Sequence, residues 1–303
     1  MAKARTSYIC SDCGTSSAQL LGKCPGCKAW NTLIAETITD AGKRSHRYSN
    51  STAQGGVLTK KARPLAEVSI EDVIRLSSGE GELDRVLGGG VVPGSLILLG
   101  GEPGIGKSTL MLQVAMMVSS SGAKVLYVSG EESPEQVRMR AQRIGSVPKS
   151  LMVLPETRVP MVLNALKEDE FALLVIDSVQ TLDQPEVDGV PGSVSQIRES
   201  VAAITAYAKS FALPVFLVGH ITKEGSLAGP KVLEHMVDVV LQFEGDRNHA
   251  YRMLRASKNR FGTTSELGIY EMMGDGLQAV ENPSEVLLGE AGEASSGSAI
   301  SVA

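Results

Sequence analysis

Between residues 95 and 219, short apolar runs alternate with stretches in which apolar residues recur every three or four positions. A continuous apolar run is typical of a strand buried on both faces, and the recurring spacing is typical of a helix with one buried face. Their alternation predicts a mostly parallel sheet covered by helices. Strands are expected at residues 95–99, 124–129, 151–154, 171–176 and 214–219.

Four helices are expected between these strands, and a turn at residues 78–84 is expected to lead into a short helix before the first strand. One follows the glycine-rich loop that ends at residue 106, and the others span residues 134–145, 159–167 and 194–211. Ser133, with Pro134 after it and Gln136 at the third helical position, has the pattern of a capping box. The last helix is expected to bury one apolar face: Val194, Ile197, Val201, Ile204, Ala208 and Phe211.

The C-terminal part loses the helical spacing and keeps the apolar runs. Runs at residues 237–243, 251–256 and 267–272 predict strands that follow one another directly. Strands of this kind predict an antiparallel extension of the sheet, so the expected fold class is α/β with a mixed sheet. Residues 284–303 are small and polar, and their last six residues resemble the beginning of a further strand.

The first 64 residues differ in charge from the rest of the chain. They contain ten Lys or Arg and three Asp or Glu, whereas the whole chain has a net charge of −5. Residues 38–64 are polar and basic without periodicity, which predicts a linker. Its cations either contact a polyanion or belong to a solvated tether, and the sequence leaves both interpretations open.

All four cysteines lie near the N-terminus in the pattern C-x2-C-x10-C-x2-C: Cys10, Cys13, Cys24 and Cys27. Four thiolates at this spacing suit tetrahedral Zn²⁺ and leave no ligand position open for catalysis. No signal-peptide core or membrane-length apolar run is present, so we expect a cytoplasmic protein, in which structural disulfides are rare. We therefore predict a structural zinc ribbon at residues 1–37, with free thiols or a redox pair as the alternative.

One loop has a spacing that predicts nucleotide binding. Residues 101–108 fit G-x-x-x-x-G-K-[ST], preceded by a predicted strand and followed by a predicted helix. Glycines let backbone N–H groups face phosphates, and the helix N-terminus adds positive potential. The expected binding residues for ATP and Mg²⁺ are Gly101, Glu102, Pro103, Gly104, Ile105, Gly106, Lys107, Ser108 and Thr109.

Acidic residues follow two of the predicted strands. Asp177 comes directly after residues 171–176, at the end where α/β sheets bind ligands, and is expected to hold Mg²⁺. Glu131 and Glu132 follow residues 124–129, a strand expected next to the P-loop strand, and Glu131 is assigned the task of orienting the attacking water. The alternatives are that Asp177 caps a helix and that both glutamates favour the N-terminus of the next helix.

Two further motifs have polar side chains at the ends of strands. His220 ends the run at residues 214–219 and is expected to sense the γ-phosphate, unless it is an ordinary satisfied histidine. Residues 258–262 read K-N-R-F-G and bring together two cations, an amide and an aromatic ring. Lys258 and Arg260 are expected to reach phosphates of DNA or of ATP on a neighbouring subunit, with a solvated basic turn as the alternative.

Together these motifs resemble the bacterial RadA (Sms) family of RecA-related DNA repair ATPases. The resemblance covers residues 8–282 and rests on the cysteine ribbon, L-D-R-V-L-G-G-G at residues 83–90, the P-loop and K-N-R-F-G. It implies a RecA-like ATPase core at residues 65–283 that forms a ring, commonly a hexamer, around single-stranded DNA in the bacterial cytoplasm. ATP hydrolysis would drive branch migration, and branched DNA, a RecA-type recombinase and a replicative helicase are the implied partners.

The resemblance also implies roles for individual residues. Glu131 would be the catalytic carboxylate, with Asp177 as the Walker B acid and Lys107 on the phosphates. Lys258 would act on the ATP of a neighbouring subunit, and Arg260 would help at ATP or DNA. The regions 183–195 and 223–231 would line the DNA channel, where the cationic contacts would be Lys223 and Lys231.

The family continues into a Lon-protease-like scaffold domain, of which residues 284–303 would be the start. Loss of that scaffold would favour an ATP-gated adaptor that binds DNA or a recombinase without motor activity, whereas a catalytic glutamate favours a DNA-dependent ATPase. A small-molecule kinase with a zinc ribbon would lack the long polar loops and the K-N-R-F-G motif. The predicted function is the DNA-dependent ATPase.

Overall fold

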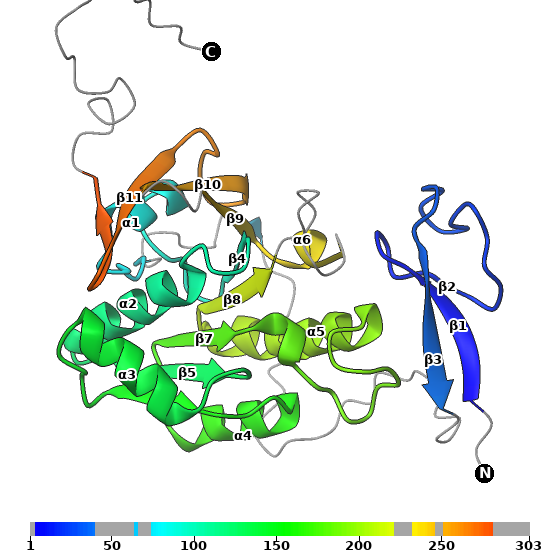
Figure 1. Cartoon of the computed structure of the whole chain (residues 1–303), viewed down its shortest axis with the longest axis horizontal. Coiled ribbons are helices and arrows are strands. Elements are labelled where there is room, and N and C mark those ends of the chain that lie inside the picture. The colour runs from blue at the N-terminus through cyan, green and yellow to red at the C-terminus, as the bar shows by residue number, and fades with distance from the viewer. Residues whose placement is uncertain (1–3, 40–63, 66–73, 221–231, 246–250, 281–303) are drawn as a thin grey trace, which may run out of the picture.

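The computed structural model describes residues 4–39, 64–65, 74–220, 232–245 and 251–280. These residues form a small antiparallel sheet at the N-terminus and a nine-stranded sheet in the rest of the chain (Figure 1). The small sheet has the order β2-β1-β3 and consists of β1 (Ala4–Cys10), β2 (Ser16–Ser17) and β3 (Leu33–Thr39). Apart from residues 38–39 and 64, the predicted linker and the predicted tail at 284–303 lie outside the described residues.

The large sheet has the order β12-β11-β10-β9-β4-β8-β7-β5-β6. The strands from β9 to β6 are parallel to their neighbours, and β10 to β12 extend the sheet in antiparallel fashion. This arrangement confirms the predicted mixed sheet. Its strands are β4 (Leu96–Gly101), β5 (Val125–Ser129), β6 (Leu151–Leu154), β7 (Leu173–Asp177), β8 (Val215–His220), β9 (Val239–Glu244), β10 (Tyr251–Asn259), β11 (Leu267–Met273) and β12 (Gly276–Ala279).

The helices lie where the apolar spacing predicts them, with one addition. They are α1 (Gly81–Leu87), α2 (Lys107–Ser120), α3 (Pro134–Ile144), α4 (Val159–Glu168), α5 (Val194–Phe211) and α6 (Val232–Met236), with a short 3-10 turn η2 (Val179–Thr181). Neither α6 nor β12 was predicted, because elements of five and four residues are too short to show a period. At the start of α3, the Ser133 hydroxyl accepts from the Gln136 N–H and the Gln136 side chain accepts from the Ser133 N–H, which confirms the capping box.

The strand order corrects one expectation about the site. The strand before Glu131 was expected beside the P-loop strand, but β8 and β7 lie between β4 and β5. The sequence could not show this, because all the strands concerned are apolar runs of similar length and nothing in them marks the neighbour of each. Glu131 therefore reaches the P-loop region across the ends of β7 and β8, not from an adjacent strand.

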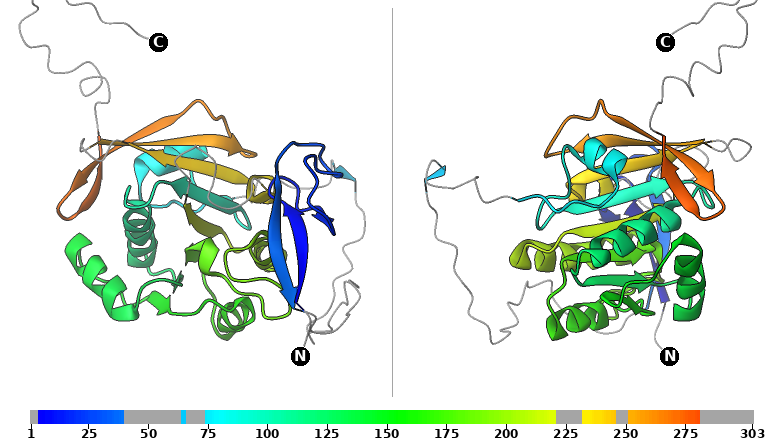
Figure 2. Two further views of the ribbon diagram at one scale, coloured as in Figure 1. Left: turned by 45° about the vertical axis from the view of Figure 1, so that its right-hand side comes forward. Right: turned by 90° about the vertical axis from the view of Figure 1, so that its left-hand side faces the viewer.

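Both faces of the central strands are buried, which explains their continuous apolar runs. On β4, Ile97 and Leu99 belong to one core together with α1, α2 and α3, while Leu96 and Leu98 belong to a second core with α4 and α5. Helices thus enclose the sheet from both sides (Figure 2). Strand side chains alternate between the two faces, so every position of a central strand must be apolar.

Two helices depart from the simple amphipathic picture. α2 is buried on nearly all sides because the β11–β12 hairpin covers it, and Gln113 on α2 exchanges hydrogen bonds with the backbone of Leu277 at 2.8 Å each. On α5 the predicted inward face is buried except at its last residue. Phe211 is 65% exposed and stacks on Tyr207 with a ring-centroid distance of 4.4 Å, because the helix ends beyond the core.

Among the described residues, no helix is both long and apolar enough to cross a membrane.

Candidate functional site

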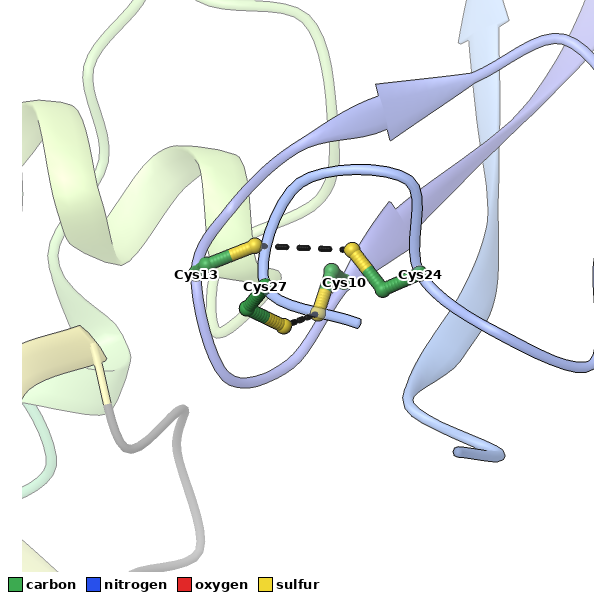
Figure 3. A group of neighbouring side chains, drawn as sticks. All are labelled: Cys10, Cys13, Cys24 and Cys27. Carbon is green, nitrogen blue, oxygen red and sulfur yellow. Dashed lines mark hydrogen bonds between the residues drawn. The ribbon is translucent and has the colours of Figure 1, made fainter. Parts of the chain in front are cut away.

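The four cysteines of the N-terminal sheet converge on one point. Cys10 ends β1 and leads into a tight turn, and the four sulfur atoms all lie within 4.8 Å of one another (Figure 3). The sulfur atoms of Cys13 and Cys24 are 3.5 Å apart, and those of Cys10 and Cys27 are 3.6 Å apart. Zn–S bonds of about 2.3 Å in a tetrahedron require sulfur separations of about 3.8 Å. The thiols therefore fit Zn²⁺ as a structural ligand set, and their separations are too long for disulfides.

The P-loop connects β4 to α2 at the carboxyl ends of the parallel strands. Gly106 has φ 115°, and a Cβ there would lie 2.6 Å from the Cε of Met272. A Cβ on Gly101 would lie 2.5 Å from the carbonyl oxygen of Phe243 on β9. Gly101 needs to be glycine because the neighbouring strand approaches it directly, and Gly106 because of its positive φ. Glycine at the N-cap leaves the start of α2 without a side-chain cap, as suits a site for phosphate.

The remaining predicted loop residues lie in the same turn. Ile105 is buried, whereas Glu102 and Pro103 are exposed at its surface. Ser108 and Thr109 are half-buried in the first turn of α2. The nine predicted residues therefore form one continuous loop and helix start.

Lys107 is folded back onto this loop. Its ammonium group donates to the carbonyl oxygens of Gly101 and Glu102 at 2.8 Å each and lies 3.3 Å from His220 Nδ1. An ammonium group can only donate, so Nδ1 accepts and the imidazole proton lies on Nε2. Burial lowers the pKa of Lys107 to about 8, against the opposing effect of Asp177, Glu131 and Glu102.

Glu131 and Asp177 approach this group from the ends of β5 and β7. The Glu131 carboxylate accepts from the Ser178 hydroxyl at 2.7 Å and lies 3.6 Å from His220 Nε2. Asp177 accepts from the hydroxyl of Tyr127 at 2.7 Å, and burial, followed by Asp177, raises the pKa of that tyrosine well above its usual value. His220 thus lies between the P-loop lysine and the carboxylate expected to orient water.

Glu132 has a different environment. Its carboxylate forms an ion pair with Arg140 on α3, and its backbone is held by the hydroxyl of Ser129. The alternative that both glutamates serve the following helix therefore fits Glu132 and does not fit Glu131, whose partners belong to β8 and the end of β7.

The K-N-R-F-G motif lies at the opposite end of the sheet. Lys258 pairs with Val240 on β9, and Val240 pairs with Leu98 on β4, three residues before Gly101. At about 3.3 Å per residue, the motif is on the order of 10 Å or more from the P-loop along the direction of the strands. Lys258 and Arg260 therefore do not serve the nucleotide site of their own chain.

Each cation of this motif has partners in its own chain. Lys258 Nζ donates to the carbonyl oxygens of Glu234 and Val237 at 2.6 and 2.7 Å. Arg260 Nη1 donates to the carboxylate of Asp238 at 3.1 Å. The same buried carboxylate accepts from Lys209 at 2.6 Å and from the backbone N–H of Leu96 at 3.1 Å.

The two predicted DNA regions differ in what the structure describes. Lys223 and Lys231 lie outside the described residues. The loop at 183–193 is organised by the buried side chain of Gln196, which bonds the backbone of Gln184 and Val187. It contains no lysine or arginine, so only its backbone N–H groups and polar side chains are available to phosphate.

Three residues near the site were not predicted. Ser178 holds Glu131 and Tyr127 holds Asp177, while Arg252 on β10 is buried and donates from Nε to the Ile105 carbonyl of the P-loop at 3.2 Å. Arg252 had a signal, because it is a charged residue at an inward position of an alternating strand. Ser178 and Tyr127 had none beyond their proximity to Asp177 and Ser129 in the sequence.

Comparison with known proteins gives two family matches. Residues 61–226 match the family described as an AAA domain, and residues 8–35 match the family described as a rubredoxin metal binding domain. Similar proteins named DNA repair protein RadA include those of Bacillus subtilis, 49% identical over 301 residues, and of Halalkalibacterium halodurans, 47% identical over 300 residues. A third, from Listeria monocytogenes, is 47% identical over 302 residues. Each alignment covers 99% of this chain and 65% of the relative, so the chain spans about two thirds of their length.

Removal of the metal should unfold the N-terminal sheet and leave the large sheet folded. The sulfur cluster lies in a small core of Cys10, Cys24 and Leu33, which is too small to be stable without the metal. We expect a strong chelator to release about one Zn²⁺ per chain and to leave the thermal transition of the large sheet in place. Loss of both transitions together, or release of no zinc, would contradict the assignment.

Nucleotide binding should raise the pKa of Lys107 and take up a proton. Above pH 8 much of this amine is neutral in the free protein, and a bound triphosphate stabilises the charged form. At pH 8.5, calorimetry of ATP binding in buffers of different ionisation enthalpy should show uptake of a fraction of a proton. Lys107→Arg should show none, because a guanidinium group stays charged; equal uptake by both proteins would disprove the assignment.

Proposed function

Since the chain belongs to the AAA domain family, we propose that it is an ATP hydrolase of recombinational DNA repair whose turnover depends on DNA. The names of its relatives support the repair role, and the site supports the hydrolysis. The observation that carries the proposal is the contact of His220 with both Lys107 and Glu131 at the carboxyl end of the sheet.

The proposed mechanism assigns one task to each group. Lys107 exchanges its loop carbonyls for the β- and γ-phosphates, and Ser108, Thr109 and Asp177 hold Mg²⁺, which neutralises phosphate charge when bound. Glu131 orients a water molecule in line with the γ-phosphate, and Ser178 keeps that carboxylate in place. His220 detects the γ-phosphate through Lys107, because the phosphate competes for the same ammonium group.

The proposed assembly is a homo-oligomeric ring, with six subunits by resemblance. Lys258 and Arg260 lie too far from the P-loop of their own chain, so in this proposal they reach ATP across the boundary with a neighbouring subunit. Arg260 is half-exposed beside Asp238 and serves ATP or DNA.

The proposed substrate of the ring is single-stranded and branched DNA, on which hydrolysis drives branch migration. A recombinase of the RecA type and a replicative helicase are the proposed protein partners, and the bacterial cytoplasm is the proposed location. Lys223, Lys231 and the loop at 183–193 are the proposed DNA contacts.

Glu131→Gln should keep ATP binding and slow turnover by about two orders of magnitude, because an amide orients water poorly and accepts no proton. Glu132→Gln is the matched control, since that carboxylate is paired with Arg140 outside the site. The measurement is single-turnover hydrolysis beside equilibrium ATP binding. Equal rates for the two variants would contradict the role of Glu131.

Single-stranded DNA should raise the steady-state rate of ATP turnover, and moderate salt should reduce that stimulation, because phosphate contacts release counterions. The rate is measured with and without DNA at low and moderate salt. If ATP binds and DNA does not change the rate of ATP turnover at either salt concentration, the motor function is wrong and an ATP-gated adaptor is favoured.

A further inference from the structure

Ile9 of the zinc ribbon is buried against residues outside the ribbon. Along β1, Cys10 faces the interior of the ribbon with Cys24 and Leu33. Ile9 points to the opposite face of the same strand, as alternation requires, and is only 8% exposed. Its apolar neighbours are Val194 and Met236, and the ribbon stands beside α5 and α6 (Figure 1).

A second contact strengthens this docking. Gly14, in the turn of the first cysteine pair, lies so close to Arg198 that an added Cβ would be 2.9 Å from its Nη1. Val194 and Arg198 are on the first turns of α5, so one side of the ribbon rests there. Met236, at the end of α6, completes the contact.

The end of α6 also holds Lys258. The carbonyl oxygens of Glu234 and Val237, on either side of Met236, accept from the Lys258 ammonium group at 2.6 and 2.7 Å. The last carbonyls of a helix have no partner within the helix, so a cation is their natural donor. One short segment therefore contacts Ile9 through a side chain and Lys258 through its backbone.

The position of α6 depends on its tertiary contacts. A helix of five residues has almost no stability of its own. Leu233 and Val237 anchor it in the second core, against which Met236 also packs. Ile9 contacts Met236 from the ribbon side. A shift of this turn moves both carbonyls that hold Lys258.

We propose that the zinc ribbon, by docking on α6 through Ile9 and Met236, positions Lys258 for the ATP of the neighbouring subunit. The proposal rests on the proposed function in one respect, the action of Lys258 between subunits. It makes the folded, metal-bound ribbon a positioning element for ATP turnover, and it assigns this task to the face of β1 opposite the cysteines.

The docking is tested directly with Ile9→Asp. Because Ile9 lies outside the ribbon core, the variant should still bind one Zn²⁺, and hydrogen exchange should show loss of amide protection at residues 232–237. Leu20→Asp is the matched control, since Leu20 is an exposed apolar residue of the same ribbon at 65% exposure. Unchanged protection of α6 in a zinc-loaded Ile9→Asp variant would overturn the docking.

The effect on Lys258 is tested in mixed assemblies. Lys107→Ala subunits lack a nucleotide site but supply Lys258, and Lys258→Ala subunits have a site but lack the cation. Mixing the two should restore turnover that neither has alone. Adding Ile9→Asp to the Lys107→Ala subunits should reduce the restored rate between about tenfold and a hundredfold, the range expected for a misplaced catalytic group. Adding it to the Lys258→Ala subunits should change little.

These outcomes separate the two proposals. If mixing restores no turnover, Lys258 does not act between subunits, and the proposed positioning role of the ribbon is rejected as well. The docking of Ile9 on α6 is then still tested by hydrogen exchange. If mixing restores turnover and Ile9→Asp acts no differently from Leu20→Asp in the Lys107→Ala subunits, the positioning role alone is wrong.

Discussion

The candidate site depends on one buried ammonium group. Lys107 is 4% exposed, and a charge at that depth costs several kcal/mol unless partners compensate for it. Two carbonyls of the P-loop and the imidazole of His220 supply that compensation. The loop, the end of β8 and, through His220, the carboxylate of Glu131 are therefore arranged around a group whose preferred partner is phosphate.

The nucleotide-binding groups and the cations of the K-N-R-F-G motif lie at opposite ends of the strands of one sheet. At the carboxyl ends lie the P-loop and the carboxylates, and at the amino ends lie the cations of the K-N-R-F-G motif. β4 connects the two ends, because Gly101 at its carboxyl end begins the P-loop and Leu96 at its amino end donates its N–H to Asp238. Asp238 in turn holds Arg260 and Lys209. A rigid strand thus fixes the separation between the nucleotide site of a chain and the cations it presents.

The sequence was sufficient for the longer helices and strands of the core, though not for α6 and β12, and it was sufficient for the residues with a motif. Continuous apolar runs marked the central parallel strands, because both faces of β4, β5, β7 and β8 are buried, and the fixed spacing of cysteines and of the P-loop marked two sites. Strand order was beyond reach, since β5, β7 and β8 have the same apolar character and only tertiary packing orders them. The partners of the motif residues were equally hidden, because Ser178, Tyr127 and Arg252 act through contacts between strands distant in sequence. The prediction that Phe211 is buried was wrong, because periodicity shows which face of a helix is buried but not where along the helix the core ends.

The position of β4 in the sheet has a consequence for synthesis of the chain. Its two neighbours are β8 and β9, so the strand that carries the P-loop has no partner until residues 215–220 have been translated and lacks its second partner until residues 239–244 follow. At about 5 to 20 residues per second, the roughly 140 residues from Gly101 to Phe243 take on the order of 7 to 28 seconds to translate. The four cysteines, in contrast, are complete within the first 27 residues. The ribbon can therefore bind its metal and fold while β4 still lacks both neighbours, which leaves an apolar strand in need of protection from aggregation on the ribosome.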